Sequence, residues 1–270
     1  MNTPLFRQMM KVNAKGISNY AVGSAFYMLL MFWLYPSIAE NSADLNDMVE
    51  SLPAGLVNAF GFENGFGSME SFISGEYYGL ILPLLLSIFS IMLSTQLMAR
   101  LVDRGSMAYL LATPTTRGRV AFTQAAVLVC GLFVIVAVTT ASGFAGSAWI
   151  IGGRYAFDAS RFLLMNAVIF LLFFAISGLS FFFSSIVNDE KRALSISGAV
   201  TIGMFSLDLL GKISGSVEWL RYLSAFSLFR PADIASGGGQ IAVACVLLPL
   251  IGLLGFAAGI AAFRRRDLPL

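Results

Sequence analysis

Long apolar runs, separated by shorter polar segments, dominate the pattern along this chain. A helix that crosses a bilayer needs about 20 consecutive, mostly apolar residues, and six runs reach or approach this length. They cover residues 17–36, 77–99, 121–142, 162–187, 193–210 and 241–263. The apolar residues in each run are continuous and do not alternate with period two, which excludes the strands of a membrane barrel. The pattern predicts an all-α integral membrane protein with six transmembrane helices in a single domain, residues 1–270.

The composition supports this class. Of the 270 residues, 57% are hydrophobic and 12% are charged, whereas soluble domains carry about 25% charged residues. The chain has no histidine, so histidine metal sites and histidine acid–base pairs are excluded. Its two cysteines, Cys130 and Cys245, fall within apolar runs. We expect both to be small buried apolar side chains and not parts of a disulfide framework.

Basic residues are distributed unevenly among the segments that flank the runs. Twelve of the 17 lysines and arginines lie in the N-terminal tail and in the segments after the second, fourth and sixth runs. The segment 37–76, after the first run, contains acidic residues and no basic one. Because basic residues concentrate on the cytoplasmic side, the distribution predicts the orientation of this multi-pass membrane protein. Both termini are then cytoplasmic and segment 37–76 lies outside.

The first 16 residues have an amphipathic helical pattern. Arg7, Lys11 and Lys15 fall on one side of the helix, and the apolar residues fall mostly on the other. This arrangement predicts an interfacial elbow helix whose basic face binds anionic lipids of the inner leaflet. A disordered basic tail is the alternative. The apolar run that follows is longer than the 7–15 residues typical of a signal peptide, so we expect it to be retained as the first span.

The segment RLVDRGSMAYLLATPTTRGRV, residues 100–120, joins the second and third runs. Its pattern predicts one short amphipathic helix that ends at Pro114, because proline does not continue a helix. The expected apolar face holds Leu101, Val102, Met107, Leu110 and Leu111. Such a helix either docks into a groove on a partner or anchors the turn at the membrane interface, and the residues alone leave both open.

Between the fifth and sixth runs, SVEWLRYLSAFSLFRPADI mixes aromatic and charged residues. Aromatic residues concentrate at the membrane–water interface, so we expect short helices at the outer headgroup level. Asp208 precedes Lys212 by four residues, a spacing that predicts an ion pair on a helix. An acid within a span is a candidate functional residue, but this one lies near the outer end beside a partner. We expect its role to be structural.

The segment 100–120 resembles the cytoplasmic segment of ABC-2 type permeases. In that family an acidic residue, a Gly-Thr/Ser step, a Leu pair, a proline and an arginine precede the next span. The matching residues here are Asp103, Gly105, Ser106, Leu110, Leu111, Pro114 and Arg117. Ala108 stands where family members often carry a second acid. The resemblance also includes the elbow, the six spans, LRYLSAFSLFRPADI and the terminal FRRRDLPL.

The resemblance implies a permease of a bacterial ABC exporter in the plasma membrane. Segment 100–120 would be a coupling helix that docks on a separate ATPase subunit, present in two copies. The permease would pair with itself or with a similar chain. ATP and Mg²⁺ would be bound by the ATPase, because this chain contains no GxxxxGK[ST] motif. We therefore expect no enzymatic activity and no cofactor in this chain, and no nucleic-acid partner.

The family's pathway is lined by the first, second and fifth spans. In this chain those spans carry Phe26, Tyr27, Phe32, Trp33, Phe89 and Phe205. An aromatic wall of this kind suits an amphipathic or lipid-like small molecule as cargo. Each of these side chains is equally suited to core packing or to contact with lipid, because aromatic residues are common in membranes.

Three other functions remain as alternatives. A secondary carrier or channel that works without ATP usually has acidic residues or broken helices near the bilayer midplane, and the six runs hold no acid there. A membrane enzyme needs a clustered set of acidic or nucleophilic groups, which the sequence does not offer. A non-transporting accessory subunit would carry the same docking helix.

Overall fold

The computed structural model describes residues 1–112, 115–238 and 241–266. Within this part of the chain, six helical stretches are long and apolar enough to cross a membrane. They are α1 (Thr3–Glu40), the stretch Met69–Asp103, α8 (Arg117–Gly146) with η2 (Ser147–Ile151), α9 (Ala159–Ile186), α10 (Glu190–Ile213) and α12 (Ile241–Arg265). The predicted all-α membrane fold is confirmed.

Polar side chains set where several of these helices begin. The Asn2 side chain accepts a hydrogen bond from the Leu5 N–H at the start of α1, and the Thr116 side chain accepts one from the Arg119 N–H at the start of α8. Asp158 and Asp189 cap α9 and α10 in the same way. Each cap satisfies a backbone donor that the first helical turn leaves unpaired.

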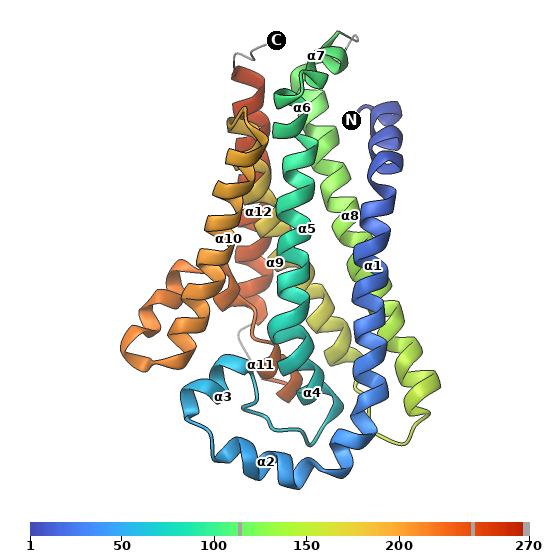
Figure 1. Ribbon diagram of the computed structural model, residues 1–270, viewed down its shortest axis with the longest axis vertical. Coiled ribbons are helices and arrows are strands. Elements are labelled where there is room, and N and C mark those ends of the chain that lie inside the picture. Colours follow the sequence, from blue (N-terminus) through green and yellow to red (C-terminus); the bar gives the residue numbers. More distant parts are fainter. Residues whose placement is uncertain (113–114, 239–240, 267–270) are drawn as a thin grey trace.

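The long helices run roughly parallel to one another, and both termini lie at the same end (Figure 1). That end also carries two short helices, α6 (Ala99–Asp103) and α7 (Ser106–Leu111). The opposite end carries α2 (Ser42–Glu50), α3 (Ala54–Phe60), α4 (Met69–Glu76) and α11 (Pro231–Ser236). We call these the termini end and the loop end.

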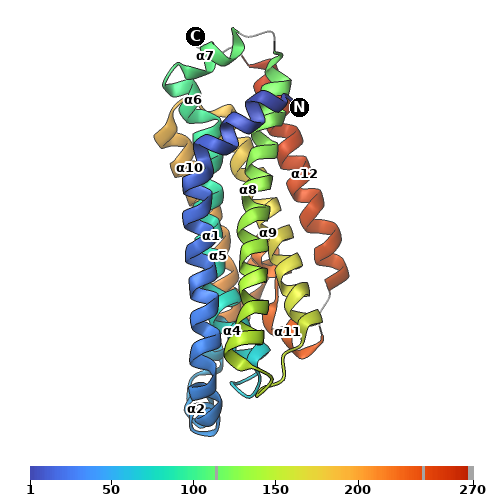
Figure 2. The same ribbon diagram turned by 90° about the vertical axis from the view of Figure 1, so that its right-hand side faces the viewer.

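Helix α1 continues from Thr3 to Glu40 without a break at residue 16, where we expected the elbow to pass into the first span. Its first turns tilt away from the rest of the helix (Figure 2). Arg7, Lys11 and Lys15 are exposed, while Leu5, Phe6, Met9 and Met10 are half-buried against the core. Val12 is exposed, unlike the other apolar residues of this stretch.

The second span begins at Met69, earlier than the apolar run. Ser68 caps it by accepting a hydrogen bond from the Ser71 N–H. The stretch then passes through a π-helix, η1 (Tyr77–Ile81), into α5 (Leu82–Leu97). Met98 has non-helical backbone angles (φ −123°, ψ −77°), which separate α5 from α6. The Ala99 N–H after this break donates to Ser184 Oγ of α9 at 3.2 Å.

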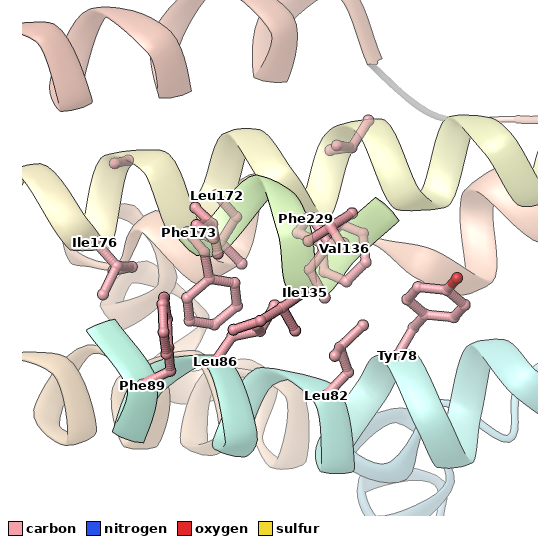
Figure 3. Packing of buried hydrophobic residues seen from close by; sticks show 14 of the residues in the cluster. Tyr78, Leu82, Leu86, Phe89, Ile135, Val136, Leu172, Phe173, Ile176 and Phe229 are labelled. Atoms are coloured by element: carbon pink, nitrogen blue, oxygen red, sulfur yellow. The ribbon is translucent and has the colours of Figure 1, made fainter. Parts of the chain in front are cut away.

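The core lies between the second span, α8 and α9 (Figure 3). Its labelled side chains from these elements are Tyr78, Leu82, Leu86, Phe89, Ile135, Val136, Leu172, Phe173 and Ile176. All of them are buried. Helix α1 packs along α8, where Phe32 lies against Gly146 so closely that a Cβ there would be 2.7 Å from the ring.

Glycines bring α9 and α12 into backbone contact. A Cβ on Gly178 of α9 would lie 2.5 Å from the Gly252 carbonyl oxygen, and one on Gly255 would lie 2.6 Å from the Gly178 carbonyl carbon. Small residues permit such close approach between membrane helices. The two cysteines are free; Cys130 is half-buried and Cys245 is exposed, so the burial expected for Cys245 is not observed.

Short helices follow α10, as the sequence predicted. They are two 3₁₀ segments, η3 (Gly215–Leu223) and η4 (Ala225–Leu228), and then α11. The 3₁₀ segments project sideways from the bundle (orange in Figure 1). The predicted ion pair is present, with Lys212 Nζ 2.8 Å from Asp208 Oδ2, and Arg221 Nε adds a second contact at 3.3 Å.

Candidate functional site

The segment that the sequence predicted to dock on a partner lies at the termini end, as residues 99–112 (Figure 1). We call it the tip. It forms two short helices, α6 and α7, where the sequence suggested one. Gly105 lies between them with φ +67°, a left-handed conformation that glycine adopts without steric cost. Ser106 begins α7, and Pro114 lies outside the described residues.

The tip is attached to the start of α10. Arg100 Nε and Arg104 Nη2 lie 3.7 and 3.8 Å from the two carboxylate oxygens of Glu190. Asp103 Oδ2 accepts a hydrogen bond from the Glu190 N–H at 3.2 Å. The tip is therefore joined to the second span through the chain and to α10 through these contacts.

The two tip helices bury one side and expose the other. Val102 and Met107 are buried, and Leu101, Leu110 and Leu111 are half-buried against the core. Tyr109 is 82% exposed. Sequence reasoning missed Tyr109, although its position was informative: a residue two places after Met107 points to the other side of a helix, because only i, i+3 and i+4 neighbours share a face.

Two arginines, Arg117 and Arg266, join helix ends near the tip. Arg117, the first residue of α8, donates from Nη1 to the Arg266 carbonyl oxygen at 2.6 Å. Arg266 donates from Nη1 to the Ser185 carbonyl at 2.7 Å and also contacts Asn188 Oδ1. Partial burial lowers the pKa of Arg266, because desolvation disfavours its charged form. The ends of α8, α9 and α12 are thus joined at one place.

The six aromatic residues expected along a pathway do not form one wall. Phe26 and Trp33 are exposed on the outer side of α1, at 67% and 66%. Phe32 is buried and packs against Phe157 with ring centroids 5.7 Å apart. Phe205 lies on α10 and contacts Phe226.

Tyr27 and Phe89 lie where α1 faces the second span. The Tyr27 ring stacks on Tyr77 with centroids 5.9 Å apart, and Phe89 meets Tyr20 edge-on at 5.4 Å. A cavity of about 210 Å³ lies beside the latter pair. Its lining includes Asn13, Gly16, Tyr20, Phe89, Met92 and Gln96. We call this cavity the groove between α1 and α5; of the six expected pathway residues, Phe89 lines it and Tyr27 does not.

Comparison with known proteins gives one family. The family model described as "ABC-2 family transporter protein" matches residues 28–268. The match includes the tip, all the spans after the first, and residues 28–40 of the first span. A comparison with curated proteins finds no match. Among the residues that the structure describes, no group of three or more cysteine, aspartate and glutamate side chains is arranged to hold a metal ion.

Proposed function

The chain belongs to the ABC-2 family of transporter proteins, and on that premise we propose that it forms the membrane pathway of an ATP-driven exporter in the bacterial plasma membrane. A separate ATPase subunit supplies the energy, and that subunit binds ATP and Mg²⁺. Two ATPase copies act on two permease chains, which are either identical or similar. Both termini lie in the cytoplasm, in agreement with the concentration of basic residues at that end.

The observation that carries this proposal is the exposed tyrosine on an anchored tip. Tyr109 is exposed beside half-buried leucines, and large aromatic residues are frequent anchors at protein interfaces. We infer that the tip docks on the ATPase through Tyr109, while Leu110 and Leu111 pack against the core and hold α7 in place. Asp103, Gly105, Ser106 and Arg117 set the shape of the segment and do not all touch the partner, and Pro114 lies outside the described residues.

The attachments of the tip support a coupling role. A displacement of the tip acts on the second span directly and on α10 through Glu190, since Arg100, Arg104 and Asp103 all contact that residue. The basic face of Arg7, Lys11 and Lys15 holds the first turns of α1 at the inner leaflet. Movement of the second span and α10 relative to α1 then opens the pathway to one side of the membrane or the other.

The aromatic and apolar character of the groove between α1 and α5 supports an amphipathic or lipid-like small molecule as cargo. Tyr20, Tyr27 and Phe89 provide flat apolar surfaces, while Asn13 and Gln96 provide polar groups near the termini end. Phe26 and Trp33 face outward from α1, where they contact either lipid or the second permease chain.

Replacing Tyr109 with Asp tests ATPase docking directly. Because Tyr109 is exposed, the change leaves the buried face of the tip intact, whereas Leu110→Asp or Leu111→Asp would place a charge against the core. We expect recovery of the ATPase subunit to fall at least about tenfold, as for loss of an interface anchor. The measurement is a mild-detergent pull-down from native membranes, with mass spectrometry and an ATP-hydrolysis assay.

Tyr222→Asp is the matched control, because Tyr222 is 90% exposed on η3, away from the tip. This variant should retain the ATPase at the level of the unaltered chain. Equal recovery with Tyr109→Asp would contradict docking at the tip. Purification of the unaltered chain without any ATP-hydrolysing subunit would overturn the proposed function in favour of an ATP-independent carrier or channel, or of an accessory subunit.

A further inference from the structure

Among the described residues, Glu76 is the carboxylate of the second span that has neither an ion pair nor a hydrogen bond, whereas Glu70 and Asp103 each accept a hydrogen bond. Glu76 is the last residue of α4 and is half-buried. Among the described residues, the ion pairs involve Asp158, Asp208, Asp233 and Glu190 but not Glu76. A half-buried carboxylate without a partner is costly, and an acid at a membrane span is a candidate functional residue. The apolar run alone did not reveal Glu76, because the run begins at the next residue.

The contacts of its neighbours place Glu76 between α1 and the loop end. Tyr77 stacks on Tyr27, and the Tyr77 hydroxyl lies 2.6 Å from Ser24 Oγ. At 1.5 Å per residue, Tyr27 is about 18 Å from Lys15 and about 20 Å from Glu40. These are the nearest charged residues along α1 on either side. Along the second span, Glu76 is about 36 Å from Arg100 at the same rise, which exceeds the hydrocarbon thickness of about 30 Å. Gly75 also lies against Gly61 at the loop end, so Glu76 lies near the loop-end boundary of the membrane.

Aromatic surface surrounds the approach to this carboxylate. Glu76 is close enough to Tyr27 to interact with it electrostatically. Tyr20 and Tyr27 are seven residues apart and therefore lie on one face of α1, which continues from the groove cavity beside Phe89 toward Glu76. The π-helix η1 begins at the residue after Glu76, and such widened turns are frequent at functional sites.

We propose that the Glu76 carboxylate and the Tyr27 ring bind the positively charged group of the cargo, so that the transported class is hydrophobic organic cations. A carboxylate neutralises the charge, aromatic faces attract cations, and the groove between α1 and α5 accepts an apolar body. This inference rests on the proposed function, because it names the cargo of the same pathway. The proposal excludes a neutral or anionic lipid-like cargo. An unpaired carboxylate would repel an anion, and a neutral cargo would leave the charge of the carboxylate without a counter-charge.

Two probe ions of the same shape and opposite charge test the proposal. Tetraphenylphosphonium is a hydrophobic cation, and tetraphenylborate is its anionic counterpart. Binding of each is measured by equilibrium dialysis to the purified full chain in lipid nanodiscs, with empty nanodiscs as baseline. We expect the unaltered chain to bind the cation at least about tenfold more tightly than the anion. Glu76→Gln should weaken cation binding at least about tenfold, the loss expected for one charge-assisted contact.

Glu63→Gln is the matched control, since Glu63 is an exposed carboxylate at the loop end, and it should leave cation binding unchanged. Glu76→Asp keeps the charge and should retain the preference for the cation. Equal affinity of the unaltered chain for both ions would overturn the proposal whether or not any variant folds. An unchanged cation affinity in Glu76→Gln would also overturn it. Neither measurement includes the ATPase, so a failure here is distinct from a failure of the docking test.

Discussion

Asp208 is a buried acid that is paired with two basic side chains. It is 4% exposed and contacts Lys212 and Arg221. The Lys212 contact was predictable, because four-residue spacing brings two side chains together on any helix. The Arg221 contact was not, because it depends on how η3 folds back on α10. Gly211 permits that return, since a Cβ there would lie 2.4 Å from the Arg221 side chain.

Replacing Asp208 with Asn should reduce stability, because the change leaves Lys212 and Arg221 without a counter-charge. We expect a loss of about 2 kcal/mol in the free energy of unfolding, typical of a broken hydrogen bond to a charged group. It would be measured as a lower midpoint of thermal unfolding in detergent. Glu218→Gln, at an exposed acid of the same η3 segment, should leave the midpoint unchanged. Lost transport with an unchanged midpoint would contradict a structural role for Asp208.

At the scale of elements, apolar length was sufficient to predict the six spans and their approximate bounds. The irregular points were not predictable. The second span breaks at Met98, beside Ser184, and its π-helix η1 begins at Tyr77. Both irregularities depend on which residues of other helices the span contacts. Gly105 was visible in the sequence, but its left-handed conformation, which divides the tip, was not inferred.

The sequence also did not show which side of each span faces the core and which faces lipid. In a soluble helix the polar side marks the surface, but in a membrane the lipid-facing side is as apolar as the buried side. The sequence therefore located Phe26 and Phe32 without indicating that one is exposed and the other buried. For the candidate site, the tip could be located from sequence, while Tyr109 became apparent from its exposure and Glu76 from its lack of a partner.

The contact between α9 and α12 gives a prediction at the same scale. Gly178→Ala should lower the midpoint of thermal unfolding, because its Cβ would lie 2.5 Å from the Gly252 carbonyl oxygen and the two helices must separate. Overpacking of this kind costs about 1–3 kcal/mol. Gly198→Ala on α10 is the matched control, since a Cβ there meets nothing within 4 Å. It should be neutral or stabilising, because alanine favours helix by about 1 kcal/mol over glycine. Equal effects of the two changes would contradict close packing at Gly178.

For the whole molecule, the two ends differ in charge and in shape. The termini end has the tip and most of the arginines, while the loop end has the acidic helix α2 and the short helices around it. An even number of spans places both termini on one side, and from the concentration of positive charge there we propose that this side is the cytoplasm. The orientation matters for function, because an ATPase reaches the tip only from the cytoplasm.

Cysteine labelling in intact cells tests this orientation. Starting from a variant without Cys130 and Cys245, we expect a membrane-impermeant thiol reagent to label Ser51→Cys, at the exposed end of α2. The same reagent should label Tyr109→Cys only after the cells are opened, although that position is also exposed. The reverse pattern would place the tip outside and remove the basis for ATPase docking.

The backbone contact between α9 and α12 also has a mechanical consequence. Where glycines leave no side chains between two helices, the backbones touch directly. Neither helix can then slide or rotate without a steric clash, because no side chain can change rotamer to make room. We expect α9 and α12 to move together as one rigid body. Shape changes then occur at contacts filled by side chains, such as those of α1 with the second span. In the transporter that we propose, α9 and α12 stay fixed relative to each other while the outer helices move.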